Sequence, residues 1–138
     1  MELHLLRVFL AALGAFVAYM AMGFALFAAL PAMKSEFQKY PHIYREEKEL
    51  MKLMPLGMLA IFVSILAVAV LYAMMYRGGT WWIWGLHLGV LIGVFALGTF
   101  VIHNHVNLRI SWKLTIMQGV AYFCQWVVVG IVIGLIYK

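Results

Sequence analysis

Four long apolar runs constrain this chain more than any other feature of its sequence. They cover residues 8–33, 54–76, 81–101 and 114–137, and none of them contains an Asp, Glu, Lys or Arg. Each run has roughly the 20 residues with which a helix crosses about 30 Å of hydrocarbon. None shows the two-residue alternation of a membrane barrel strand. The sequence therefore predicts an all-α, polytopic membrane protein: a single domain, residues 1–138, folded as a bundle of four transmembrane helices with a polar loop at residues 34–53.

Composition excludes the main soluble alternatives. Hydrophobic residues make up 67% of the 138 residues and charged residues 11%, whereas soluble domains are about half apolar and about a quarter charged. A soluble domain of this size leaves much of its surface wet and cannot bury so large an apolar fraction. The net charge of +5 does not indicate nucleic-acid binding. The basic residues stand singly at the ends of the apolar runs and form no basic face with interleaved aromatic residues.

The distribution of charge predicts an orientation. An even number of spans puts both termini on one side of the membrane. Most Lys and Arg residues fall in the first and third connections, residues 34–53 and 102–113. The positive-inside rule places these two connections in the cytoplasm and both termini outside. The first run is much longer than the roughly 7–15-residue apolar core of a signal peptide, so we expect it to be a retained helix.

The connections carry turn signals of different kinds. The segment Arg-Gly-Gly-Thr at residues 77–80 predicts a tight turn that makes the second and third spans antiparallel neighbours. In the first connection, Pro41 is placed to begin a short helix, and Arg45 and Glu49 have the spacing of a helical ion pair. Pro55 either begins the second span or kinks its start.

Small residues recur at helical spacing in all four runs. In lipid, helices associate where small residues let their backbones approach closely. We therefore predict that the four helices pack tightly against one another. The glycines expected at these contacts are Gly14, Gly57, Gly85, Gly89, Gly93, Gly130 and Gly134.

The fourth run carries a polar face formed by Gln118, Tyr122 and Gln125, which recur at steps of three and four residues. Amide groups are costly against lipid, so this face is expected to turn toward the bundle interior or a partner. Counting the rise per residue puts Tyr19 and Ser64 near the membrane level of Gln125. These residues predict a polar layer. Its role is interhelical hydrogen bonding or, alternatively, the floor of a small polar cavity.

His87 is the histidine that lies inside an apolar run. A buried imidazole can be an axial ligand to a haem or a chlorophyll-type pigment, and Gly85 and Gly89 would leave room beside it for a flat macrocycle. No second histidine lies at matching depth on another run, as a bis-histidine haem requires. The alternative is a histidine that is hydrogen-bonded across the bundle. The sequence itself requires no cofactor.

His103 and His105 lie with Asn104 and Asn107 in a polar segment after the third run. Imidazoles, together with methionines predicted on the same side of the membrane, suit copper, which makes this pair a candidate metal site. The alternative is an interfacial cap that binds the last carbonyls of the run. No serine or cysteine is accompanied by an adjacent acid–histidine pair, so we expect no enzyme activity. Cys124 is the only cysteine, which excludes an internal disulfide.

The stretch at residues 98–137 has a pattern of its own. The segment HNHVN at residues 103–107 leads into WKL at residues 112–114 and a last helix that contains glycine. Together with a first run that ends in Leu26-Phe27 before Lys34, this pattern resembles small four-span bacterial membrane proteins classed as domains of unknown function. The resemblance implies a four-helix fold and a bacterial inner membrane, and it implies no activity.

These features favour a structural or accessory subunit, without catalytic activity, that packs within a larger membrane complex of respiratory or photosynthetic type. Its expected partners are the lipid bilayer and other membrane subunits. One alternative is a small oligomeric carrier or channel that uses the polar face of the fourth run. Another is a haem- or pigment-binding membrane protein that uses His87.

Overall fold

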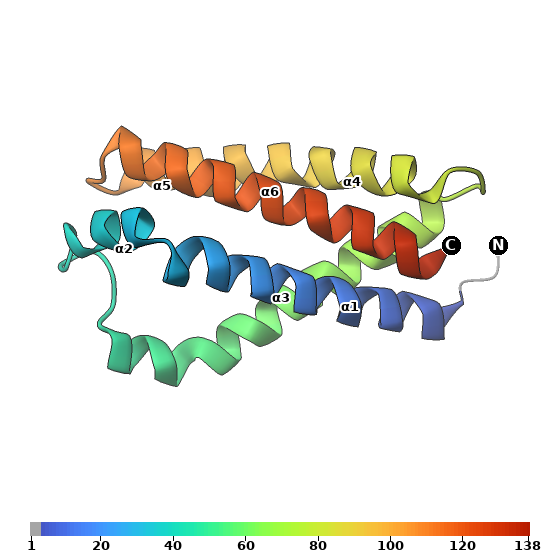
Figure 1. The fold of residues 1–138 in the computed structure, drawn as a ribbon, viewed down its shortest axis with the longest axis horizontal. Helices are drawn as coiled ribbons and strands as arrows, with labels where there is room; N and C mark the ends of the chain where they lie inside the picture. Colours follow the sequence, from blue (N-terminus) through green and yellow to red (C-terminus); the bar gives the residue numbers. More distant parts are fainter. Residues whose placement is uncertain (1–3) are drawn as a thin grey trace.

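The structure, a computed structural model, describes residues 4–138 (Figure 1). It is 85% helical and has no strand in this range. The helical segments in chain order are α1 (Leu5–Gly23), the π-helical segment η1 (Phe24–Ala29), α2 (Pro31–Gln38), α3 (Glu47–Met75), α4 (Trp81–Ala96), the π-helical segment η2 (Leu97–Ile102), α5 (His103–Asn107) and α6 (Trp112–Tyr137).

Four helical stretches are long and apolar enough to cross a membrane: Leu5–Ala29, Glu47–Met75, Trp81–Asn107 and Trp112–Tyr137. The all-α class and the four-helix bundle are therefore confirmed. The start of α1 and the end of α6 lie at one end of the bundle, where the Arg7 guanidinium donates to the Lys138 main-chain oxygen at 3.2 Å (Figure 1). We call this the terminal end, and the opposite end, formed by residues 30–46 and 103–111, the loop end.

Several helix boundaries differ from those predicted. The first span ends at Ala29 rather than residue 33, because Pro31 restricts Leu30 to an extended conformation and then begins α2. The short helix of the first connection thus begins at Pro31, and Pro41 lies in a turn. The third span continues to Asn107 rather than residue 101.

Helix α3 begins at Glu47, one and a half to two turns before the predicted start at residue 54, and Pro55 lies inside it. Glu47 and Glu49 stand in its first turn, where carboxylates interact favourably with the helix dipole. The predicted ion pair between Arg45 and Glu49 is present, with 3.6 Å between nitrogen and oxygen. These interactions extend the helix beyond the apolar run that marks it in the sequence.

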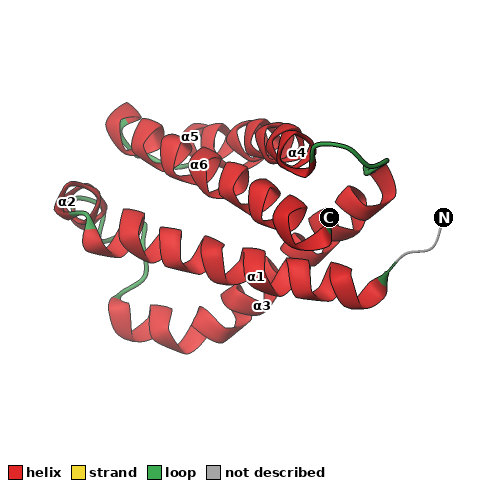
Figure 2. Ribbon diagram, turned by 45° about the vertical axis from the view of Figure 1, so that its right-hand side comes forward, coloured by secondary structure: helices red, strands yellow, loops and turns green. Residues whose placement is uncertain are grey.

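Helix α6 is central in the bundle. It packs along α4 on one side and along α1 on the other, while α3 crosses α1 obliquely (Figures 1 and 2). Helices α3 and α4 are joined by a turn in which Gly78 and Gly79 have φ angles of 89° and 91°. Beyond that turn they diverge. The prediction that the second and third spans are close antiparallel neighbours is therefore wrong, since the main partner of α4 is α6.

Glycines explain why α4 pairs with α6. A Cβ atom at Gly89 would lie 2.7 Å from the Trp126 carbonyl oxygen, and one at Gly134 would lie 2.6 Å from the Trp81 carbonyl oxygen. Gly85 and Gly130 face each other in the same contact. Such backbone-to-backbone approach is possible only where side chains are absent.

The other three predicted packing glycines have different surroundings. A Cβ atom at Gly93 would lie 2.8 Å from the Phe123 ring, and Gly14 faces the Ile136 side chain of α6. Gly57 has open space around its Cβ position, so its assignment to a helix contact is wrong. Gly57 belongs to the half of α3 that leaves the bundle.

The two halves of α3 differ in their surroundings. The C-terminal half packs into the core, where Ile65 and Ala69 are fully buried and Phe62 contacts the rings of Phe9 and Phe16 on α1. In the N-terminal half, every residue from 46 to 60 is exposed except Met58, which is half-buried. The N-terminal half of α3 therefore stands apart from α1, as Figure 2 shows.

A buried carboxylate closes the loop end. Glu36 of α2 is 2% exposed, and its Oε1 lies 2.7 Å from the Nζ of Lys39 and 2.7 Å from the Nζ of Lys113. The Ser111 main-chain N–H donates to the Tyr40 hydroxyl at 2.9 Å. These contacts join the first connection to the start of α6 and fix α1 and α6 relative to each other.

Candidate functional site

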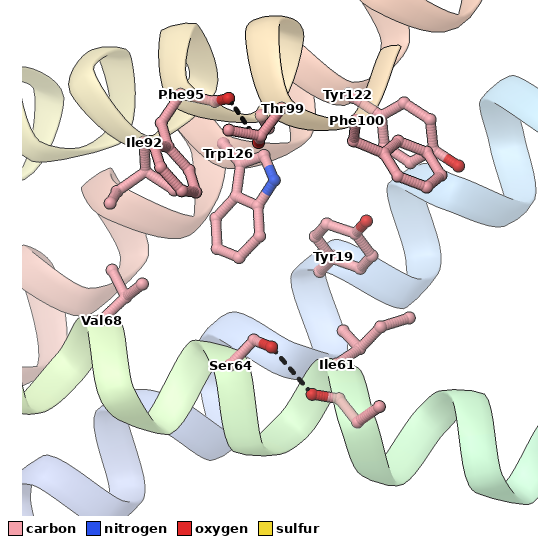
Figure 3. Close-up of a pocket in the computed structure, with 12 residues that line it drawn as sticks. Tyr19, Ile61, Ser64, Val68, Ile92, Phe95, Thr99, Phe100, Tyr122 and Trp126 are labelled. Atoms are coloured by element: carbon pink, nitrogen blue, oxygen red, sulfur yellow. Dashed lines mark hydrogen bonds between the residues drawn. The ribbon is translucent and has the colours of Figure 1, made fainter. Parts of the chain in front are cut away.

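A lateral cleft of about 550 Å³ lies where α3 and α4 diverge (Figure 3). Helix α3 forms one wall, α4 with η2 forms the other, and α1 and α6 close the cleft from behind. It lies between the two ends of the bundle, at the middle of the spans. The residues that line it are Tyr19, Ala60, Ile61, Ser64, Val68, Ile92, Phe95, Ala96, Thr99, Phe100, Tyr122 and Trp126.

Helical periodicity brings the α3 wall together. Ala60, Ser64 and Val68 are four residues apart and so lie on one face of the helix. The opposite wall includes Thr99 and Phe100, which belong to the π-helical segment η2. A π-helical turn is wider than an α-helical one and is frequent at functional sites.

Both π-helical segments contact Tyr122. Its ring centroid lies 5.2 Å from that of Phe27 in η1 and 5.3 Å from that of Phe100 in η2. The second of these contacts is edge-to-face, an arrangement that aromatic pairs prefer. Tyr122 is therefore held between two spans at the back of the cleft.

The hydroxyl groups of the cleft fall into two sets. Ser64 and Thr99 donate within their own helices, to the carbonyl oxygens of Ala60 at 2.9 Å and Phe95 at 2.7 Å (Figure 3). The Tyr19 hydroxyl, the Tyr122 hydroxyl and the Trp126 indole N–H make no hydrogen bond to any residue in 4–138. Three residues that line the cleft thus carry a hydrogen-bond donor without an acceptor in the described part of the chain.

The predicted polar layer is divided in the structure. Tyr19, Ser64 and Tyr122 meet at the cleft. Gln125 is 1% exposed and does not line the cleft. Its Nε2 donates to the Tyr19 main-chain oxygen at 3.1 Å. Gln118 lies toward the loop end, where its Nε2 approaches the Tyr44 hydroxyl at 3.4 Å. The three residues of the polar face of the fourth run therefore lie in three different environments: Tyr122 at the cleft, Gln125 in the contact with α1 and Gln118 at the loop end. They form no continuous polar path along the helix.

Among the described residues, no charged side chain lines the cleft. A cluster of charge lies around Glu36 at the loop end, where hydrogen bonds from Lys113 and Lys39 lower the pKa of the Glu36 carboxyl. Tyr44 lies beside it, and burial raises the pKa of its phenol. Ring contacts of 5.2, 6.2 and 4.8 Å lead from Tyr122 through Phe27 and Phe37 to Tyr44. Aromatic packing thus connects the cleft to the loop end.

His87 lies on α4 outside the bundle core. It is exposed and borders a small cavity of about 70 Å³ with Tyr72, Met75 and Trp84. Gly85 and Gly89 are buried against the backbone of α6. The expectation that these glycines leave room for a flat macrocycle is therefore wrong, because α6 fills that space. The alternative of a hydrogen bond across the bundle also fails, since His87 makes none within residues 4–138.

His103 and His105 lie in the short helix α5 rather than in a loop. The His105 Nδ1 is 2.8 Å from the Thr115 hydroxyl, and its ring packs on that of Trp112 with 3.8 Å between centroids. No group of three His, Cys, Asp or Glu side chains that could hold a metal ion occurs within residues 4–138. Asn107 donates to the His103 carbonyl oxygen at 2.8 Å, which is the kind of contact expected of an interfacial cap.

Four residues of the cleft were not predicted from the sequence as site residues: Phe95, Thr99, Phe100 and Trp126. One signal for Trp126 was present, because it follows Tyr122 by four residues and therefore shares its helix face. Its ring also contacts that of Tyr19 at 5.7 Å between centroids. The residues of α4 and η2 could not be identified in this way, because no polar periodicity marks them.

No protein family, no curated protein and no solved structure matches the chain.

Proposed function

We propose that this chain is a non-catalytic membrane protein that binds an uncharged, apolar ligand taken laterally from the bilayer. The observation that carries the proposal is the cleft of about 550 Å³ between α3 and α4. Its volume falls within the roughly 300–1,000 Å³ of small-molecule sites, which are also mostly apolar with a few polar groups. Its lining of aromatic and aliphatic side chains, with hydroxyls at Tyr19 and Tyr122, fits that description.

The route to the cleft supports a ligand from the lipid phase. Helices α3 and α4 diverge toward the loop end, and residues 47–60 of α3 are exposed except Met58, which is half-buried. A molecule dissolved in the hydrocarbon layer reaches such a cleft from the side, without crossing a polar surface. A polar solute would have to leave water first, which costs free energy unless its polar groups are compensated.

Tryptophan fluorescence tests this proposal. The chain has five tryptophans. One variant keeps Trp126 and replaces the other four by Phe. The control variant keeps only Trp82, which is 47% exposed and lies outside the cleft. Both proteins are placed in lipid vesicles, and bromododecane is added. The quenching of Trp126 fluorescence should reach a plateau, whereas the quenching of Trp82 fluorescence should rise in proportion to the bromododecane concentration. Ala60→Leu places a larger side chain in the cleft without adding a tryptophan. In the protein that keeps only Trp126, this substitution should remove the saturable part of the quenching.

If bromododecane quenches both single-tryptophan proteins in proportion to its concentration, the cleft holds no ligand and only dissolves the probe like any lipid-facing surface. The same conclusion follows if Ala60→Leu leaves saturable quenching of Trp126 unchanged.

A second candidate function, an accessory subunit of a larger membrane complex, is favoured by His87. Its side chain lies within a span and is exposed, and no residue of 4–138 binds the imidazole. Ionisable side chains in spans usually face the protein interior or a partner, because lipid solvates them poorly. Extraction in a mild detergent followed by native mass spectrometry tests this role. A stoichiometric complex supports it, and an isolated monomer contradicts it.

We further propose a bacterial inner membrane as the location, with both termini outside and residues 34–53 and 102–113 in the cytoplasm. The excess of Lys and Arg in these two connections supports this orientation. The Glu36–Lys113 ion pair, with 2.7 Å between its charged atoms, joins the two connections at one end of the bundle.

A further inference from the structure

We infer that the cleft selects a flat, uncharged ring that carries carbonyl oxygens, the chemistry of a quinone. This inference rests on the proposed function, because it names the class of ligand for the same cleft. Three properties of the cleft support it: the shape of its lining, its unpaired hydrogen-bond donors and its lack of charge.

The shape of the lining favours a ring. Aromatic side chains come from four helical segments around the cleft, with Tyr19 on α1, Phe95 on α4, Phe100 in η2 and Trp126 on α6 (Figure 3). Flat rings pack against such side chains in offset or edge-to-face geometries, which gives them an advantage beyond the area that they bury. The aliphatic part of the lining, Ile61 and Val68 of α3, provides contact for an alkyl tail.

The unpaired donors favour carbonyl oxygens. Tyr19, Tyr122 and Trp126 line the cleft and carry two hydroxyls and one indole N–H, and none of these groups has an acceptor within residues 4–138. An indole N–H can only donate. The Ser64 and Thr99 hydroxyls already donate to their own helices, so the donors of the tyrosines and the tryptophan are those left for a ligand. A ligand with acceptor oxygens satisfies them, and a pure hydrocarbon leaves them unsatisfied.

The lack of charge excludes ionised ligands. No Lys, Arg, Asp or Glu of residues 4–138 lines the cleft, and the charged cluster of Glu36, Lys39 and Lys113 lies at the loop end. A carboxylate or phosphate held at the middle of the spans would have no counter-charge, which is strongly unfavourable in a medium of low dielectric constant. Fatty acids and phospholipid headgroups are therefore not the groups that this cleft recognises.

Two probes with the same tail separate these possibilities. Decylbenzoquinone carries two ring carbonyls, and decylbenzene carries the same alkyl chain on a ring without oxygen. Their dissociation constants are measured in detergent from the rise in the midpoint of thermal unfolding with probe concentration, since a ligand that binds only the folded state stabilises it. We expect decylbenzoquinone to bind at least about tenfold more tightly, which corresponds to one or two net hydrogen bonds.

Substitution of the two tyrosines tests whether their hydroxyl groups bind the ring carbonyls of decylbenzoquinone. Tyr19→Phe and Tyr122→Phe keep the ring contacts with Trp126, Phe27 and Phe100, so the fold is retained. Combined in one chain, they should remove most of the preference for decylbenzoquinone and leave decylbenzene binding unchanged. The control is Tyr76→Phe, because the Tyr76 hydroxyl donates to the Gly79 carbonyl oxygen at the terminal end, away from the cleft.

The outcomes distinguish this inference from the proposed function. If neither probe binds, the cleft is not a ligand site and both proposals fall. If decylbenzene binds as tightly as decylbenzoquinone, or if the double variant keeps the preference, the cleft binds apolar molecules without recognising carbonyls. In that case the inference fails and the proposed function stands.

Discussion

The side-chain Nε2 of Gln125 on α6 donates to the main-chain oxygen of Tyr19 on α1 at 3.1 Å, while the Oε1 of the same amide is buried without a partner in the described chain. The bond lies one turn before α1 gives way to the π-helical segment η1. It therefore fixes the backbone that carries one of the two cleft phenols. The unpartnered oxygen offsets part of this gain, because a buried acceptor without a donor is destabilising.

Gln125→Leu should change the free energy of unfolding by less than about 1 kcal/mol. The variant loses one interhelical hydrogen bond, worth about 0.6 kcal/mol on average in membrane proteins, and it removes an unsatisfied acceptor. Gln125→Ala should cost about 1–3 kcal/mol more, because it also leaves a cavity. Unfolding in mixed micelles followed by far-ultraviolet circular dichroism measures both. Equal losses for the two variants would show that the amide, rather than its packing, stabilises this contact.

Gly89→Ala should destabilise the fold by about 1–3 kcal/mol or more, the range for overpacked sites. Its Cβ atom would lie 2.7 Å from the main-chain oxygen of Trp126, so α4 and α6 must separate to admit it. Gly57→Ala is the matched control, because nothing lies within 4 Å of the Cβ position. There the better helix propensity of alanine should stabilise by up to about 1 kcal/mol. The prediction is contradicted if both substitutions shift the unfolding midpoint in the same direction.

Glu36→Gln should lower stability at neutral pH and have little effect in acid. Lys113 and Lys39 hold the pKa of Glu36 below its ordinary value in the folded state. A depressed pKa stabilises the fold above the unfolded-state pKa, and the stabilisation is lost as the pH falls through the folded-state pKa. The difference between wild type and variant should therefore close on acidification. Unfolding curves measured across a pH series test this.

Glu49→Gln provides the control for that experiment. Glu49 pairs with Arg45 at 3.6 Å, but its side chain is 61% exposed. Ion pairs on an open surface contribute little. Its pH profile should follow that of the wild type, and a difference as large as that of Glu36→Gln would mean that burial is not the source of the effect.

Labelling with a membrane-impermeant maleimide should reveal the orientation. Cys124→Ala removes the only cysteine, and Ser35→Cys or Thr80→Cys then adds one at an exposed position on the loop end or the terminal end. In intact bacterial cells, the Thr80→Cys protein should react from outside, and the Ser35→Cys protein only after permeabilisation. The reverse pattern would invert the proposed topology.

The four spans were predictable because uncharged runs of this length have one stable structure in lipid. Their partners were not. The turn at residues 77–80 suggested that α3 and α4 pair, but a short turn sets only where two helices meet and not the angle at which they leave it. The glycines decided the outcome, because Gly85 and Gly89 allow the backbone of α6 to approach more closely than any face of α3. The spacing of Gly85 and Gly89 in the sequence showed that they form a ridge on one helix face, but it did not show which helix packs against that ridge.

The candidate site was predictable only in part, for a related reason. Tyr19, Ser64 and Tyr122 could be placed at similar depths by counting residues, and all three line the cleft. Gln125 shares a helix face with Tyr122 in projection, yet it points into the contact with α1. Depth follows from the rise per residue, whereas direction depends on which neighbour each helix face meets. The cleft exists because two helices diverge, and no local pattern records that divergence.

The splayed half of α3 has a mechanical consequence. Only its C-terminal half, where Ile65 and Ala69 are fully buried, is anchored in protein. From Glu47 to Ala60 the helix extends about 20 Å beyond that anchor. It therefore acts as a lever with its fulcrum at residues 61–73, and a tilt of about 10° at the fulcrum moves the far tip by about 3.5 Å. The width of the cleft mouth is therefore set by how the anchored half of α3 packs. Adding one methyl group at the fully buried Ala69 changes this width more than a substitution at the far end of the helix, near Glu47.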